Sequence, residues 1–212
     1  MAPPLSAMYD KLYRRFGPQH WWPAGTPFEV MLGAILTQNT SWSNVEKAIL
    51  NLKRSHVLDP DRLFRMRQSG LASLIRPAGY YNIKAARLKN FLRFFFSSCD
   101  GSVRSMARKP THILRAQLLA VNGIGPETAD SILLYALKKP VFVVDAYTRR
   151  ILCRHKLIRE TASYEDIQQV FMRALRSDVQ LFNEYHALLV RLGKEYCLKN
   201  RPRCEQCPLT TR

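Results

Sequence analysis

The spacing of apolar residues is the feature that most constrains how this chain folds. In four segments, apolar residues recur three and four positions apart, which is the period of a helix with one buried face. A strand would alternate with a period of two, and Val141–Val144 is the one β-like run, too short to anchor a sheet. The pattern predicts an all-α protein with helices over residues 28–36, 45–52, 85–95 and 113–121.

Glycine and proline divide this helical pattern into short pieces. The breaks predict about ten short helices joined by tight turns. They fall at residues 17–18, 22–23, 59–60, 77–79, 99–101, 123–126 and 139–140. With 212 residues and 47% hydrophobic content, the chain can bury one substantial core or two small ones. No internal repeat is evident, so composition alone indicates no domain boundary.

The charge balance points to a polyanionic partner. Lys and Arg total 33 against 16 Asp and Glu, a formal net charge of +17 that is spread along the chain. This favours a folded, basic face for nucleic acid, with an anionic membrane surface second and a generally basic soluble surface as the alternative. There is no apolar run of about 18 residues and no apolar signal region at the start, so we expect a cytoplasmic protein without a membrane span.

A glycine-containing turn separates two helical segments at residues 118–129, which read LLAVNGIGPETA. Pro126 suits the first turn of the second helix, where its missing N–H would have no partner. Gly123 and Gly125 have no side chain to cover the backbone, so N–H groups at the start of the helix can approach a phosphate oxygen. Taken alone, such a turn could equally connect two core helices.

The context of this turn makes the pattern specific. VNGIGPETAD is followed by VVDAYTRRIL, which carries Asp145. Together they resemble the helix-hairpin-helix and catalytic-aspartate signature of the endonuclease III superfamily of DNA glycosylases. Upstream, MLGAILTQNTSWSNVEKA and RPAGYYNIKAARLKNF resemble a DNA-facing helix and turn and the GxYxxKA segment of that family. The resemblance covers nearly the whole chain.

The resemblance implies two helical lobes that bind double-stranded DNA containing a damaged base, with the active-site cleft between them. One is a helical barrel with the hairpin, residues 23–134. The other comprises residues 1–22 and 135–196 and carries the aspartate, followed by a Cys-rich loop at 197–212. We expect a monomer. Asp145 would stabilise the positive charge that develops on the sugar, and its position before a helix also suits an N-cap.

Glu127 stands where strand-cleaving members of this family carry a lysine that forms a Schiff base. A carboxylate cannot form an imine, so we expect water to be the nucleophile and strand cleavage to be absent. The alternative is that Glu127 only favours the helix start through its charge and that Lys84 or Lys194 supplies the amine.

Glu127, together with Trp21-Trp22-Pro23, is similar to the 3-methyladenine glycosylase branch of the superfamily. Alkylated purines carry a positive charge, so an aromatic slot can select them by stacking and cation–π attraction. The expected walls are Trp21 or Trp22 on one side and Trp42 on the other. The alternative for the adjacent tryptophans is an ordinary core plug between the lobes.

Three further positions follow from the same resemblance. Gln38 or Asn39 would fill the space left by the extruded base, or would cap the end of a helix. Tyr81 would lie beside the pocket, although packing is its commoner role. Lys84 would lie near the DNA phosphates.

The five cysteines, without an export signal, favour free thiols or metal ligands over disulfides. Cys197, Cys204 and Cys207 match the spacing of three ligands of the family's [4Fe–4S] cluster. The fourth ligand would fall one residue beyond Arg212. Either the natural protein has a Cys there, which the intact spacing favours, or it has lost the cluster. Zinc lacks its usual second ligand pair here, and Cys99 and Cys153 suit buried apolar positions.

Several functions remain open at this stage. The preferred one is a glycosylase that releases an alkylated purine without lyase activity. The others are a bifunctional glycosylase/lyase acting on oxidised pyrimidines, an adenine-mismatch glycosylase, and a non-catalytic DNA-binding module that uses the hairpin as a clamp.

Overall fold

The computed structural model describes residues 5–210, and these are helical with no strand, which confirms the expected all-α class. The chain divides into two compact units. We call Ala24–Lys139 the central unit, and Met1–Pro23 together with Pro140–Arg212 the terminal unit. Within residues 5–210, no helix is both long and apolar enough to cross a membrane.

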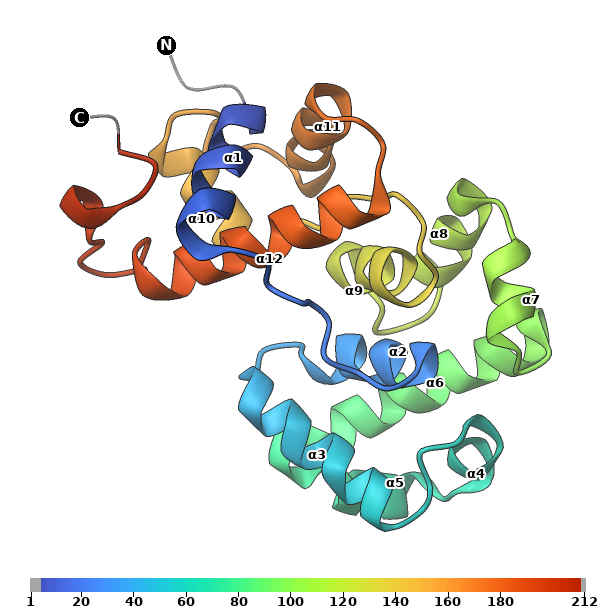
Figure 1. Cartoon of the computed structure of the whole chain (residues 1–212). Coiled ribbons are helices and arrows are strands. Elements are labelled where there is room, and N and C mark those ends of the chain that lie inside the picture. The colour runs from blue at the N-terminus through green and yellow to red at the C-terminus, as the bar shows by residue number, and fades with distance from the viewer. Residues whose placement is uncertain (1–4, 211–212) are drawn as a thin grey trace. The chain divides into compact units, whose positions relative to one another are not determined.

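The central unit is built from eight α-helices and two short helical turns (Figure 1). They are α2 (Pro27–Leu36), α3 (Trp42–Arg54), α4 (Pro60–Arg65), α5 (Gln68–Leu74), η1 (Arg76–Ala78), α6 (Tyr81–Cys99), α7 (Val103–Arg108), α8 (Thr111–Leu119), α9 (Pro126–Ser131) and the π-helical turn η2 (Ile132–Ala136).

Helix α2 forms the core of the central unit. Thr26 caps it by accepting from Glu29 N at 3.1 Å, and Pro27 occupies its first turn. All residues from Phe28 to Leu36 are buried, as expected for a helix that is apolar on every side. It packs against α3, α6, α9 and η2. This burial fixes the position of the turn that follows Leu36.

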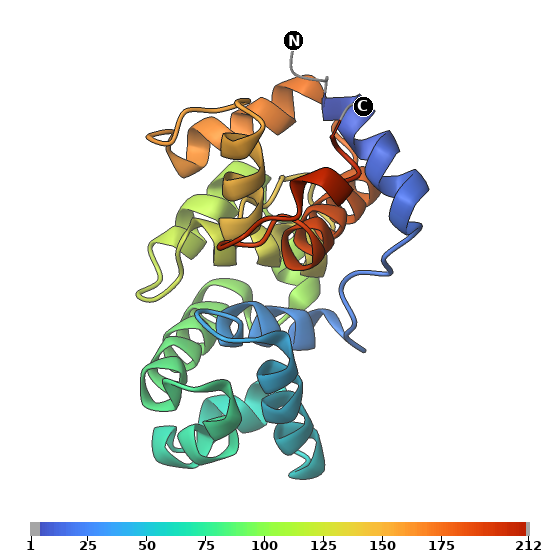
Figure 2. The same cartoon turned by 90° about the vertical axis from the view of Figure 1, so that its left-hand side faces the viewer.

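The terminal unit comprises α1 (Leu5–Phe16), α10 (Ala146–Arg154), α11 (Tyr164–Ala174), α12 (Val179–Glu195) and the short turn η3 (Cys204–Gln206). Figures 1 and 2 show α1 and α10 packed against α12. Gly193 is where α12 meets α10, because a Cβ there would collide with the side chain of Tyr147. Arg150 of α10 also donates to Gly193 O at 3.0 Å and to Cys197 O at 2.7 Å. The two helices are therefore held in close contact.

The segment Val141–Val144 is buried but forms no strand. Its backbone groups bond instead to side chains around α11: Phe142 O accepts from Gln168 Nε2 at 2.7 Å, and Val144 N donates to Tyr164 Oη at 3.3 Å. The Phe142 ring stacks on Phe171 with centroids 3.8 Å apart. Residues 141–144 thus form an extended segment that runs from the aromatic core to Asp145 at the start of α10.

Candidate active site and DNA-binding hairpin

Asp145 is the N-cap of α10, as its position in the sequence suggested. Its backbone is extended, and its Oδ1 accepts from Thr148 N at 2.7 Å. The side chain is only 10% exposed. The cap therefore holds the carboxylate in one orientation at the edge of the unit's core.

The second carboxylate oxygen of Asp145 faces His186, a residue that the sequence did not single out. His186 lies on α12, is 5% exposed, and places Nε2 3.6 Å from Asp145 Oδ2. Burial by itself raises the pKa of the Asp145 carboxyl, but the electrostatic interaction with His186 and the hydrogen bond from Thr148 N outweigh it, so the pKa lies below its ordinary value. The carboxylate is ionised at neutral pH although it is nearly buried.

The hairpin between α8 and α9 contains two glycines, Gly123 and Gly125, and a steric reason requires the first of them. Gly123 has φ +94°, and a Cβ there would collide with the side chain of Arg87. Gly125 is exposed, is the N-cap of α9 with φ −93°, and has open space where a Cβ would stand. Gly123 thus serves the internal packing, while the surface beside Gly125 is clear for the close approach of a partner.

Side chains from α6 and from the turn after α2 orient the peptide planes of the hairpin. Asn90 Nδ2 donates to Asn122 O at 3.1 Å, and Gln38 Nε2 donates to Gly123 O at 3.0 Å. The C=O and N–H of a trans peptide point in opposite directions, so the Gly123 N–H is turned away from Asn90. The carbonyl groups of Asn122 and Gly123 therefore accept hydrogen bonds from within the central unit.

A buried ion pair joins the two helices of the hairpin. Arg115 of α8 donates from Nε to Asp130 Oδ1 at 2.7 Å and from NH2 to Asp130 Oδ2 at 3.0 Å, and the Asp130 side chain is fully buried. Such a two-point contact fixes direction as well as distance. It sets the angle between α8 and α9.

The structure separates the roles of the two adjacent polar residues in the turn after α2. Gln38 bonds inward, to Gly123 O, to Thr128 Oγ1 at 2.9 Å and to the guanidinium of Arg87. Asn39 is exposed and has φ +53°. Gln38 ties the turn to the hairpin, so of the two, Asn39 is the one presented to solvent.

Lys84 does not lie on the surface as the phosphate-binding expectation required. It is 1% exposed, and its Nζ donates to Leu36 O at 2.8 Å and to Ala78 O at 2.7 Å. Burial, reinforced by the charge of Arg87, lowers its pKa to about 8. Through these contacts it joins α6 to the ends of α2 and η1. Lys194, the other alternative amine, is exposed on α12.

The start of α6 exposes a different tyrosine from the one the sequence favoured. Tyr81 is half-buried, with the guanidinium carbon of Arg76 5.9 Å from its ring centroid. Tyr80, just before α6, is 69% exposed and has φ +45°. An exposed aromatic in a left-handed conformation is unusual, and that feature could not be read from the sequence.

The three tryptophans are distributed over both units. Trp21 and Trp22 are half-buried in the terminal unit, with ring centroids 5.4 Å apart at 59°. Trp42 begins α3 of the central unit, and its Nε1 donates to Glu46 Oε1 at 2.7 Å. Trp21 and Trp22 therefore belong to the terminal unit, and Trp42 belongs to the central unit. Glu127 lies exposed in the first turn of α9.

The three C-terminal cysteines lie close enough to influence one another. Cys197 is buried after α12, and Arg154 NH1 contacts its Sγ at 3.3 Å. Burial raises the pKa of the Cys207 thiol, and the charges of Cys197 and Cys204 raise it further. Within residues 5–210, however, no three His, Cys, Asp or Glu side chains are arranged to hold a metal ion. The donors suit an iron–sulfur cluster in kind but are not arranged as its ligands here.

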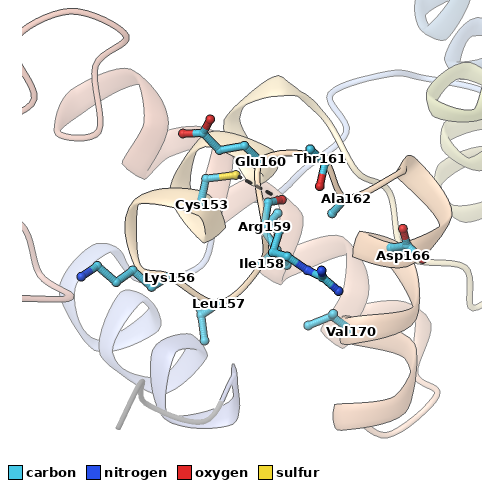
Figure 3. A pocket seen from close by; sticks show the side chains of 10 residues that line it. All are labelled: Cys153, Lys156, Leu157, Ile158, Arg159, Glu160, Thr161, Ala162, Asp166 and Val170. Carbon is cyan, nitrogen blue, oxygen red and sulfur yellow. Dashed lines mark hydrogen bonds between the residues drawn. The ribbon is translucent and has the colours of Figure 1, made fainter.

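An open pocket of ≈ 930 Å³ lies in the terminal unit between the end of α10 and α11 (Figure 3). It is lined by Cys153, Lys156, Leu157, Ile158, Arg159, Glu160, Thr161, Ala162, Asp166 and Val170. None of the site residues predicted from the sequence lines it. Cys153 is half-buried at this pocket, unlike the buried Cys99, because it faces the loop after α10.

An all-helical fold with a glycine hairpin, and an aspartate capping the helix that follows, is the arrangement that the sequence resemblance implies for DNA glycosylases of the helix-hairpin-helix class. Residues 32–177 match the family model described as "HhH-GPD superfamily base excision DNA repair protein". The chain belongs to this family.

Relatives span almost the whole chain. The protein named "Putative DNA repair glycosylase MJ1434" of Methanocaldococcus jannaschii is 49% identical over 95% of this chain and 92% of its own. Endonuclease III of Thermotoga maritima is 27% identical over 96% and 89%. The structure of H. pylori 3-methyladenine DNA glycosylase bound to 1,N6-ethenoadenine is similar with a TM-score of 0.79 and 30% identity, covering 89% and 96%.

Proposed function

We propose that this protein is a monofunctional DNA glycosylase that hydrolyses the N-glycosidic bond of an alkylated purine. The observation that carries the proposal is the nearly buried carboxyl group of Asp145, which the helix cap holds in one orientation beside His186. Breaking the bond develops positive charge on the sugar, and a fixed anion away from bulk water stabilises that charge strongly. Asp145 would also align the attacking water.

Two features support hydrolysis without lyase activity. Glu127, a carboxylate, stands at the lysine position, and Lys84 is buried with its ammonium group bonded to two carbonyls. A carboxylate forms no imine, and Lys84 would have to leave both carbonyls to reach the opened sugar, which supports hydrolysis. A water molecule is then the nucleophile, and the product retains an intact strand.

The choice of an alkylated purine rests on the aromatic residues and on a relative. Trp21 or Trp22, and Trp42, are the aromatic candidates for stacking on a cationic base, which leaves readily once it is flipped out of the duplex. The H. pylori relative is named for 3-methyladenine. Gly123 and Gly125 would bring the hairpin backbone to a phosphate, while Asn39 and Tyr80 would meet the distorted duplex.

A cofactor proposal goes with this function. Cys197, Cys204 and Cys207 would supply three of the four thiolates that a [4Fe–4S] cluster takes, with a structural rather than catalytic role. Iron and acid-labile sulfide analysis of protein purified without oxygen, with Cys204→Ser as the matched variant, tests this. Protein without iron would exclude the cluster.

The test of the function measures base release from duplex DNA containing either 3-methyladenine or an oxidised pyrimidine, scoring free base and strand breaks separately. Asp145→Asn should lower release at least about 100-fold, because one electrostatic stabiliser of a transition state is worth that much. Asp178→Asn is the matched control, since Asp178 caps α12 by accepting from Leu181 N at 2.8 Å. It should retain activity. Release of oxidised pyrimidine with strand breaks, and a borohydride-trapped adduct, would contradict the proposal.

A further inference from the structure

His186 presents the strongest feature that the function proposed above leaves unexplained. It is a nearly buried ionisable side chain whose Nε2 lies 3.6 Å from Asp145 Oδ2. That separation is longer than an ordinary hydrogen bond but close enough for a strong electrostatic interaction in a low-dielectric setting. The two groups come from different helices, so only the packing of α12 on α10 brings them together.

The two oxygens of Asp145 have different partners. Oδ1 accepts from Thr148 N at 2.7 Å, so the helix cap occupies it. Oδ2 faces His186. The cap thus fixes the rotation of the carboxyl group. The His186 imidazole lies beside Oδ2, the oxygen that does not take part in this contact with Thr148 N.

The surroundings of the pair are apolar, so an isolated carboxylate would tend to take up a proton there. Val143 and Val144 before Asp145 are buried. The ring of Phe142 lies 6.5 Å from that of His186, centroid to centroid, in an edge-on arrangement. If the Asp145 carboxylate is to act as an anion at this buried position, a neighbouring group must offset the cost of burying its charge.

Contacts of the neighbouring turns prevent His186 from moving away. Tyr185 donates from Oη to Leu5 O at 2.9 Å, which fastens the same turn of α12 to α1. The close approach of Gly193 to Tyr147 holds α12 on α10. The imidazole is therefore positioned by the fold rather than by Asp145 alone.

Three other charged groups on α1, α10 and α12 have partners elsewhere. Glu184 of α12 accepts from Gln19 N at 2.7 Å. Arg150 of α10 donates to Gly193 O and Cys197 O. Arg15 of α1 donates to Tyr196 Oη at 3.2 Å. Asp145 faces His186 from the start of α10.

We infer that His186 is a positioning residue for the reaction, which holds Asp145 Oδ2 in place and compensates for the burial of its carboxyl group. The inference rests on the proposed catalytic role of Asp145. It assigns to α12 a function in the chemistry beyond that of a packing helix. It also explains why a polar side chain stands on an otherwise apolar face there.

The decisive experiment measures the pKa of Asp145 directly, from the ¹³Cγ chemical shift across pH, in the full-length protein without DNA. Asp145→Asn assigns the signal. In His186→Gln the pKa should rise, because a neutral amide replaces the compensating group. His155→Gln, the same chemical change at the other end of α10, should leave it unchanged. An identical Asp145 pKa in wild type and His186→Gln would overturn the inference.

Activity provides a second readout that a merely structural role would not produce. In single-turnover base release, the acid limb of the rate profile should move to higher pH in His186→Gln. The rate on that limb should be about tenfold lower, the order expected from losing one opposite charge at this range. A uniform loss at every pH would instead indicate a packing defect and contradict the inference.

The two proposals fail differently. If the Asp145 pKa rises in His186→Gln but Asp145→Asn remains fully active, the pair stands and the catalytic proposal falls. If His186→Gln does not fold, the wild-type protein still decides: the His186 imidazole resonances must shift at the pH where Asp145 protonates. No response there would overturn the inference.

Discussion

The hairpin of the central unit and the Asp145 turn of the terminal unit are built by different means. The hairpin is held by polar side chains that bond to its backbone, from Gln38 and Asn90, and by the buried Arg115–Asp130 pair. The Asp145 turn also has hydrogen bonds, from its backbone to Gln168 and Tyr164, but it adds extensive apolar packing, with stacked aromatic rings before it and the Gly193 contact beside it. The hairpin thus depends on hydrogen bonds and an ion pair, whereas the Asp145 turn depends more on the packing of apolar side chains.

The difference follows from what each region would have to do. A backbone that meets a phosphate must present its N–H groups in set directions, and hydrogen bonds to the opposite carbonyls achieve that. A carboxylate that stabilises a developing cation gains strength from a low-dielectric setting, which apolar packing provides. Variants that disturb one region and spare the other test this contrast.

The largest expected effect on stability comes from Arg115→Met. It leaves the fully buried Asp130 carboxylate without its guanidinium partner, and breaking such a pair costs about 3 kcal/mol. Chemical denaturation measures the loss. Arg65→Met, which removes the exposed pair with Asp61, should cost about 0.5 kcal/mol or less. Equal costs would show that the hairpin does not depend on its ion pair.

Gly193→Ala should disturb the Asp145 side of the comparison. The added Cβ collides with Tyr147, and overpacking of this kind costs about 1–3 kcal/mol. Gly70→Ala in α5 is the control, because its Cβ would meet Met66 only at ordinary contact distance, 3.7 Å or more. That variant should be stabilised slightly. If both variants were equally stable, α12 would not be held on α10 through Gly193.

Lys84→Met should cost about 2 kcal/mol near neutral pH, because Leu36 O and Ala78 O lose their donor. The pH dependence is more specific. Between pH 8 and 10.5 the unfolded chain keeps a proton that folded Lys84 has lost, so the wild-type free energy of unfolding rises with pH. The Met variant should lack this rise. Lys47→Met, at an exposed position, should retain it.

Asn39→Gly should have the smallest effect on stability, within about 0.5 kcal/mol, because the side chain is exposed and glycine adopts φ +53° readily. Base release and binding to DNA with an abasic site should nevertheless weaken severalfold. Gln38→Ala should instead lose stability through the hairpin contacts. Unchanged DNA binding by Asn39→Gly would remove Asn39 from the DNA-facing surface.

The local features of this protein were predictable because they depend on neighbouring residues. Helical periodicity predicted the all-α class, Pro126 suited the first turn of α9, and Asp145 suited an N-cap, as the structure confirms. Each depends on residues within one or two turns of the chain. The burial of Lys84 was not predictable, because a basic side chain is expected to be exposed until its neighbours are known.

Only the tertiary structure decided which side chains meet. Gln38 bonds to Gly123, 85 residues away, and Lys84 to Leu36, 48 residues away. His186 meets Asp145 because α12 packs closely on α10 at Gly193. Periodicity identifies the face of a helix that will be buried, but not the helix that will cover it. The partner is set by how side chains of different sizes interlock across helices, and that depends on the whole fold.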